Sequence, residues 1–163
     1  MAPEGLTADA LAAEAIAKET LASTLGVSAE QRHSIAQLAY DFHEQGRLED
    51  ARTLFAGLVG LDEEDFHGRA GLGAVLLDLG RIEEAIPHLE NAVRLWPREA
   101  GAHACLGEAY LHQARFDEAA RELRRAIELD PDEKHAGAGR ARGILGSLDT
   151  LIDEVVTGSG EDG

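Results

Sequence analysis

Small and apolar residues recur along this chain at a fixed step of 34 residues. Beginning at Leu38, the step reaches Leu72 and then Leu106. Four further series keep the same residue type or size at this spacing: Ala39, Gly73 and Gly107; Ala51, Ala85 and Ala119; Gly46, Gly80 and Ala114; Leu61, Leu95 and Leu129. Because no insertion or deletion interrupts the series, the pattern indicates tandem copies of one structural unit.

Within each unit, the apolar spacing predicts two helices joined by a tight turn. The predicted helices cover 29–45 and 48–60, 65–79 and 82–94, and 99–113 and 116–128. The turns fall at Gly46, Gly80 and Ala114, because a small residue is tolerated best where the chain reverses. Pro97 and Pro131 stand where the second and third units must stop a helix.

This period and composition are those of tetratricopeptide repeats. The sequence therefore predicts an all-α fold with three repeats, at 32–65, 66–99 and 100–133, stacked into a short right-handed superhelix. Repeats of this kind hold other proteins, so binding is the expected function.

The flanking segments are predicted to complete the stack. Residues 1–31 are predicted to hold a flexible tail and a helix over 7–24, which Gly26 ends before a capping box from Ser28 to Gln31. This N-terminal helix either caps the first repeat or pairs with a second copy of the chain, and the sequence supports both equally.

Residues 134–156 are predicted to form a C-terminal capping helix, followed by a flexible tail over 157–163. Its apolar residues at helical spacing are Ile144, Leu148, Leu151, Ile152 and Val155. Its glycines at 137, 139, 143 and 146 weaken the helix, so its first half is expected to be bent or frayed.

Charge and cysteine content narrow the class of protein. Fifteen basic against thirty-one acidic residues give a net charge of −16, which disfavours binding to nucleic acid or to an anionic membrane. We find neither a signal peptide nor a run of apolar residues that could span a membrane. The single Cys105 fits a reducing compartment. We therefore expect a cytoplasmic protein.

We expect neither catalysis nor a metal or cofactor. The seven histidines form no His-Glu-x-x-His pair, and no cysteine cluster could complete a zinc site. Cys105 is interpreted as a small packing residue. The glycine-rich run over 137–143 follows no predicted strand, so it does not qualify as a phosphate-binding loop.

In repeats of this type the first helix of each pair lines a concave groove, which gives a set of candidate peptide-binding residues. The repeats contribute, in chain order, His33, Ala36, Gln37, Tyr40 and His43; His67, Ala70, Ala74 and Leu77; and Ala104, Cys105, Glu108, Leu111 and His112. Basic residues that would clamp a C-terminal carboxylate are missing from these positions. The composition favours an extended apolar segment as the ligand, although ordinary helix packing also accounts for the alanines and leucines.

A more specific likeness runs through the first half of the repeats. The stretches that carry it are Leu38-Ala39-Tyr40, Gly46-Arg47-Leu48-Glu49-Asp50-Ala51, Phe55, Leu58, Leu61-Asp62 and Gly71-Leu72-Gly73-Ala74. They resemble the class II chaperones of bacterial type III secretion, the SycD/LcrH type, over roughly residues 25–130. The resemblance implies a cytoplasmic chaperone whose groove holds a short Pro- and Leu-containing segment of a hydrophobic translocator.

Two functions follow as hypotheses. The first is a secretion chaperone that holds an apolar segment of a secreted client in the groove. The second is a scaffold that organises a bacterial complex through its convex face or its acidic surface.

The resembled family of secretion chaperones places aromatic residues on the groove side of the first repeat. Tyr40 matches one such place, whereas His43 stands where another aromatic residue is common.

Overall fold

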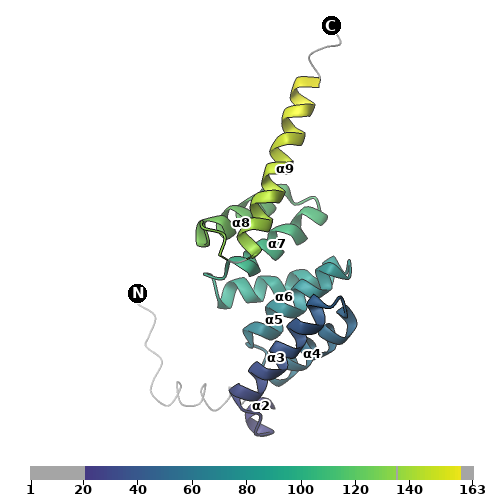
Figure 1. Cartoon of the computed structure of the whole chain (residues 1–163), viewed down its shortest axis with the longest axis vertical. Coiled ribbons are helices and arrows are strands. Elements are labelled where there is room, and N and C mark those ends of the chain that lie inside the picture. The colour runs from purple at the N-terminus through teal and green to yellow at the C-terminus, as the bar shows by residue number, and fades with distance from the viewer. Residues whose placement is uncertain (1–20, 135, 159–163) are drawn as a thin grey trace, which may run out of the picture.

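The protein is described here by a computed structural model, which describes residues 21–134 and 136–158. Over those residues the fold is all-α (Figure 1). Its helices are α2 (Leu21–Thr24), α3 (Ala29–Glu44), α4 (Leu48–Leu61), α5 (Phe66–Asp78), α6 (Ile82–Leu95), α7 (Ala100–His112), α8 (Phe116–Leu129) and α9 (Ala136–Gly158). The bounds of α3 to α8 agree within one residue with the six helices predicted from the 34-residue period.

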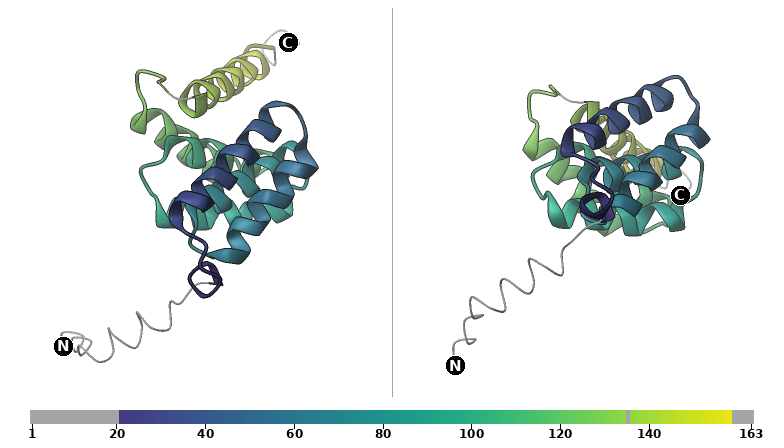
Figure 2. Two further views of the ribbon diagram at one scale, coloured as in Figure 1. Left: turned by 60° about the horizontal axis from the view of Figure 1, so that its bottom comes forward. Right: turned by 90° about the horizontal axis from the view of Figure 1, so that it is seen from below.

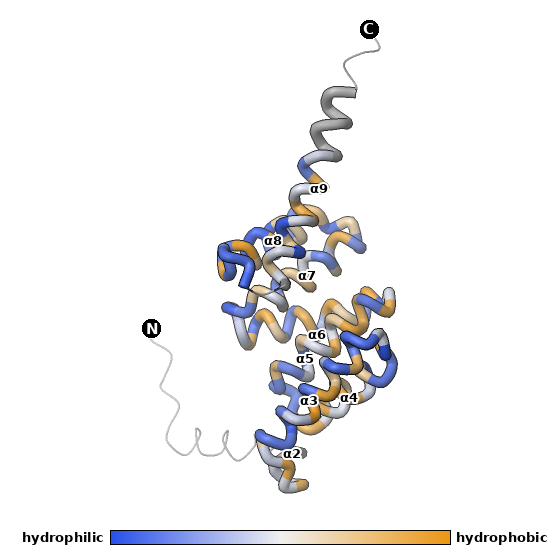
Figure 3. The backbone as a smooth tube through the Cα atoms, in the orientation of Figure 1, coloured by the Kyte–Doolittle hydropathy of each residue, from blue (hydrophilic) through white to orange (hydrophobic). Residues whose placement is uncertain are grey.

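The helices are arranged as three successive pairs, α3 with α4, α5 with α6, and α7 with α8 (Figures 1 and 2). Each second helix also packs against the first helix of the next pair, so the pairs form a continuous stack. Hydrophobic segments are distributed over all three pairs and are not gathered in one helix (Figure 3). The buried apolar residues form one cluster that runs from α3 to the start of α8 and a second one between α7, α8 and α9, as expected for a fold in which each unit contacts only its neighbours.

The turns between paired helices confirm the prediction of small residues there. Gly46 and Gly80 both have φ of 74°, and Ala114 has φ of 57°. A positive φ suits glycine, because it has no Cβ to collide with the backbone. Ala114 therefore holds a conformation that alanine adopts only at some cost.

Glycine also permits close packing inside the second and third pairs, as the sequence predicted. A Cβ at Gly73 would lie 2.5 Å from Cγ of Leu89, and one at Gly107 would lie 2.7 Å from Cγ of Leu123. Both leucines are fully buried. The first helix of each pair can thus approach the second closely enough to enclose a leucine between them.

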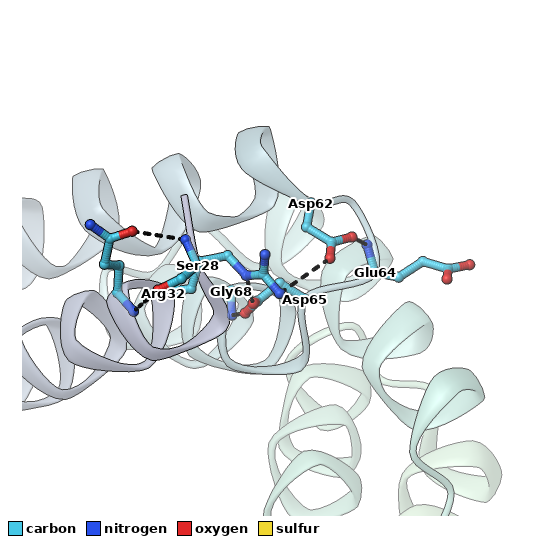
Figure 4. A network of polar contacts seen from close by, with 7 residues as sticks. Ser28, Arg32, Asp62, Glu64, Asp65 and Gly68 are labelled. Atoms are coloured by element: carbon cyan, nitrogen blue, oxygen red, sulfur yellow. Dashed lines mark hydrogen bonds and ion pairs between the residues drawn. The ribbon is translucent and has the colours of Figure 1, made fainter. Parts of the chain in front are cut away.

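A polar network fixes the start of α3 to the loop between the first two pairs (Figure 4). Ser28 and Gln31 form the predicted capping box. Arg32 then places its Nε 3.5 Å from Oδ2 of Asp65, and Asp65 in turn accepts a hydrogen bond from the backbone N–H of Gly68. One carboxylate therefore caps α5 and pairs with α3.

The three leucines of the period differ in exposure. Leu72 and Leu106 are 6% and 3% exposed, whereas Leu38 is 45% exposed. In the described residues no repeat precedes α3, so the outer face of the first pair is left less covered than its equivalents. The predicted helix over 7–24 is described only in its last residues, as α2, which ends before Gly26 at φ of 69°. The segments 1–20 and 159–163, and His135, lie outside the described residues.

The prediction for the first half of the C-terminal helix was wrong. This half of α9 is helical and is the part that packs, with Ala138 and Ala141 fully buried on α7 and α8. A Cβ at Gly137 would lie 2.7 Å from Cα of Gly101, so this glycine permits a close backbone approach to α7. By its low helix propensity this glycine was expected to destabilise the helix. In the tertiary structure it allows α9 to pack closely on α7. Beyond this contact, α9 runs away from the repeats (Figure 1).

Candidate peptide-binding groove

A cavity of about 270 Å³ lies where the first helices of the three pairs meet the start of α9. Its lining residues are Tyr40, His43, Phe66, Ala70, Gly71, Ala74, Leu77, Asp78, Glu99, Gly101, Ala102, Ala104, Cys105, Gly137 and Arg140. We call this cavity the groove. Its volume is just below the usual range of about 300–1,000 Å³ for ligand pockets, so it suits one or two side chains of an extended segment.

The floor of the groove is made of small side chains on α5 and α7. Ala70 and Ala74 are one helical turn apart on α5, and Ala104 occupies on α7 the position that Ala70 has on α5. Gly71 lies between them, and a Cβ there would lie 2.3 Å from the ring of Phe55. The buried Phe55 therefore supports the floor from below, and the absence of larger side chains keeps the groove open.

Aromatic residues form one wall. The Tyr40 ring packs edge-on against Phe55 at 5.0 Å and against His67 at 5.9 Å between centroids. Its hydroxyl lies 3.4 Å from Nδ1 of His67. Burial, aided by the nearby Asp65 carboxylate, raises the pKa of Tyr40 to about 12, so the hydroxyl stays protonated at neutral pH. Phe66 continues this wall and packs against Trp96 at 5.0 Å.

Charged residues line the groove away from the aromatic wall. Arg140 on α9 reaches Glu108 on α7 through two contacts, Nε to Oε2 at 2.7 Å and a terminal nitrogen to Oε1 at 2.8 Å. The same guanidinium is 3.9 Å from Asp78, whose Oδ2 lies 2.5 Å from Nε2 of His43. This row of charges joins α3, α5, α7 and α9, so it ties the C-terminal helix to all three repeats.

Cys105 lies in the floor of the groove. Burial raises the pKa of its thiol to about 11, so the reactive thiolate is scarce at neutral pH. This supports the interpretation of Cys105 as a packing residue.

Most of the predicted groove residues lie in the lining or next to it. Tyr40, His43, Ala70, Ala74, Leu77 and Ala104 line the groove, together with Cys105. His67 and Glu108 stand directly behind the lining, since they hold Tyr40 and Arg140. His33 lies next to His67, with ring centroids 5.8 Å apart.

The other predicted residues lie elsewhere. Ala36 is buried in the core, and Leu111 is half-buried against it. Gln37 is exposed on α3 outside the lining. His112 lies in a separate polar hollow beside the turn at Gly80 and Arg81. The superhelical turn between repeats carries equivalent positions of different repeats to different surroundings, so one register does not assign them all to the groove.

Sequence reasoning missed several lining residues. Asp78 could have been found, because the 34-residue step relates it to His112, which was predicted. Gly137 and Arg140 belong to α9, which lies outside the period, so no repeat register points to them. Glu99 precedes the predicted groove positions of the third repeat, and no sequence pattern marked it as a groove residue.

Within the described ranges, no three His, Cys, Asp or Glu residues come close enough together to hold a metal ion. None of the helices described here is long and apolar enough to cross a membrane.

Comparison with known proteins places the chain among helical repeats. Residues 36–86 and 71–134 match the tetratricopeptide repeat family, and together these matches span more than half of the chain. No curated protein matches the sequence significantly.

Among solved structures, the chain is similar to the type III secretion translocator chaperone SycD of Yersinia enterocolitica, with 26% identity and a TM-score of 0.67 over 78% of this chain and 97% of that one. SycD in complex with a peptide of the translocator YopD matches with 25% identity and a TM-score of 0.65, covering 77% and 98% of the two chains. PcrH of Pseudomonas aeruginosa with the chaperone binding region of PopB matches with 25% identity and a TM-score of 0.63, covering 72% and 97%.

Proposed function

The chain belongs to the tetratricopeptide repeat family, and from this premise we propose that it is a chaperone of type III secretion that holds an apolar segment of a translocator in the groove. The observation that carries the proposal is the groove itself, an alanine- and glycine-floored cavity that a single extended segment would fill. The likeness to chaperones whose structures contain translocator peptides supports the same ligand class.

The mechanism follows from the shape and chemistry of the groove. An apolar side chain that enters it is removed from water, and about 25 cal/mol is gained for each Å² of apolar surface buried. Part of this gain offsets the ordering of the segment. Held in this way, a membrane-inserting client would be kept from aggregation before export. We propose that this role is non-enzymatic and cytoplasmic.

The test is capture of the client by the intact chain and by groove variants. The tagged protein is expressed in its source organism and purified in about 0.5 M salt, where the Debye length is about 4 Å and surface charge contributes little. We expect mass spectrometry to identify a hydrophobic secreted translocator. Recovery of soluble partners alone, released as salt rises, would favour the scaffold hypothesis instead.

The matched variants are Ala74→Arg in the groove and Ala120→Arg on the outer helix α8. Both alanines are half-buried, and both changes add the same charge to an acidic chain. Only Ala74 lines the groove. Ala74→Arg should abolish client capture with unchanged helical circular dichroism, whereas Ala120→Arg should retain it. Equal capture by the two variants would contradict a site in the groove.

A further inference from the structure

The charges around the groove do not balance. Asp78 and Glu99 line it, and among the residues that the structure describes Arg140 is the one Lys or Arg residue in the lining. Glu108, just behind the lining, takes the two short contacts of the Arg140 guanidinium, at 2.7 and 2.8 Å, and Asp78 lies 3.9 Å from the same group. One basic group is therefore shared by two carboxylates, and Glu99 adds a further negative charge to the lining.

This excess of negative charge does not depend on the state of His43. The carboxylates of Asp78, Glu99 and Glu108 outnumber the guanidinium of Arg140 even when His43, 2.5 Å from Asp78, carries a proton. The net charge of −16 on the whole chain adds to the same potential. A cation that approaches the groove is attracted, and an anion is repelled.

The two carboxylates stand on different sides of the apolar floor. Asp78 is the last residue of α5, and Glu99 is the N-cap residue of α7. The Glu99 side chain makes no capping hydrogen bond and is exposed, so it is available to a ligand. Ala70, Ala74 and Ala104 form the floor between them. When an extended segment places one apolar side chain on this floor, its neighbours in sequence point the opposite way, out of the groove. A Lys or Arg side chain at such a position is long and flexible, so its charged end can bend back to a carboxylate at the rim.

We propose that the groove selects segments of a protein client in which a Lys or Arg residue flanks the buried apolar residue, with Glu99 and Asp78 as the residues that recognise the basic side chain. The inference rests on the proposed function. It specifies, in addition, that the bound segment carries positive charge. A client with an acidic flank would have to separate Arg140 from Glu108 before it found a partner, which opposes its binding.

The test compares three synthetic peptides of the form proline–X–leucine–X–alanine–proline, in which X is alanine, lysine or glutamate. Their dissociation constants are measured by isothermal titration calorimetry at low salt with the full chain. We expect the lysine peptide to bind about fivefold more tightly than the alanine peptide, the gain expected of a partly exposed charge pair. The glutamate peptide should bind more weakly than both. Higher salt should reduce the preference for lysine while the alanine peptide is little affected.

Variants then assign the preference to the two carboxylates. Glu99→Gln and Asp78→Asn should each lower the affinity ratio of the lysine to the alanine peptide, and Glu99→Lys should favour the glutamate peptide. Asp41→Asn is the control, because Asp41 is exposed on α3 and outside the lining. It should keep the full ratio.

The outcomes separate the inference from the proposed function. Binding of all three peptides with equal affinity would overturn the charge preference and leave the groove as an apolar site. A preference for lysine that survives both Glu99→Gln and Asp78→Asn would overturn the assignment to these residues. Failure of all three peptides to bind would contradict the proposed peptide groove and the inference with it.

Discussion

The second and third repeats have different polar pairs at the same place between their two helices. In each repeat, a side chain near the start of the first helix meets a side chain in the middle of the second. The 34-residue step relates Arg69 to His103, and His88 to Glu122. Both pairs are polar, but the histidine lies on the second helix in one repeat and on the first helix in the other, and its partners in the two repeats have opposite charge.

In the second repeat the histidine must accept a hydrogen bond. A terminal nitrogen of Arg69 lies 3.0 Å from Nδ1 of His88, and a guanidinium can only donate. Burial, reinforced by the Arg69 charge, lowers the pKa of His88 below its ordinary value. The neutral ring is therefore the form that the fold stabilises.

In the third repeat the histidine lies between two acceptors. Nδ1 of His103 lies 2.7 Å from the Glu122 carboxylate, and Nε2 lies 3.1 Å from the carbonyl oxygen of Pro97. The ring nitrogens here face oxygen atoms, whereas in the second repeat Nδ1 faces a guanidinium. The first repeat has apolar residues at these positions, Ile35 and Leu54. The fold thus requires complementary partners at this position and does not require a particular residue type.

Removal of one partner should affect the third repeat more than the second. Glu122→Ala leaves Nδ1 of His103, whose side chain is nearly fully buried, without its acceptor, and we expect a loss of about 2 kcal/mol in the free energy of unfolding. His88→Ala should cost about 1 kcal/mol, because Arg69 keeps its hydrogen bond to the carbonyl of Glu63. Urea denaturation followed by circular dichroism measures both.

The double variant His103→Ile with Glu122→Leu copies the first repeat into the third. If complementarity is what matters, its stability should return close to that of the unchanged chain, since an apolar pair replaces a buried polar one. A double variant as unstable as Glu122→Ala would show that the polar pair itself is needed.

The turns provide a smaller comparison between the same repeats. Ala114→Gly should stabilise the chain by about 1 kcal/mol, because glycine adopts φ of 57° without the steric cost of a Cβ. Gly80→Ala should destabilise it by a similar amount at φ of 74°. Thermal unfolding of the two variants measures these opposite shifts. Shifts of the same sign would argue against backbone strain as the cause.

The smallest expected effect is on how the free energy of unfolding depends on pH. The pKa of His88 is lowered in the folded chain, so the unfolded chain binds the proton more readily. The contribution of His88 to stability is therefore present above its unfolded pKa, about 6.5, and is lost as pH falls below that value. We expect His88→Leu to flatten the decline in urea stability between about pH 7 and pH 5. An unchanged slope would exclude His88 as the group responsible.

The 34-residue period was sufficient to locate the helices and the floor of the groove. Ala70, Ala74 and Ala104 were identified because helix spacing within a repeat determines which residues share a face. The charged end was not identified. Arg140 lies 32 residues from Glu108 on a helix that does not repeat, so no periodic pattern relates them.

The error on α9 has the same origin. Its glycines were judged by intrinsic helix propensity, which is a local property. Their actual effect depends on Gly101 of α7, against which Gly137 packs with no room for a side chain. Propensity carries no information about this neighbour.

The sequence by itself determined the all-α repeat fold, because each repeat is stabilised by helices adjacent in the chain and by a pattern repeated at constant spacing. The tertiary structure alone decided that α9 closes the groove, that Arg140 is neutralised by Glu108, and that Asp78 and Glu99 remain at its rims. These features depend on the angle at which a non-repeating helix meets the stack, and that angle follows from side-chain packing between segments that local sequence patterns do not relate.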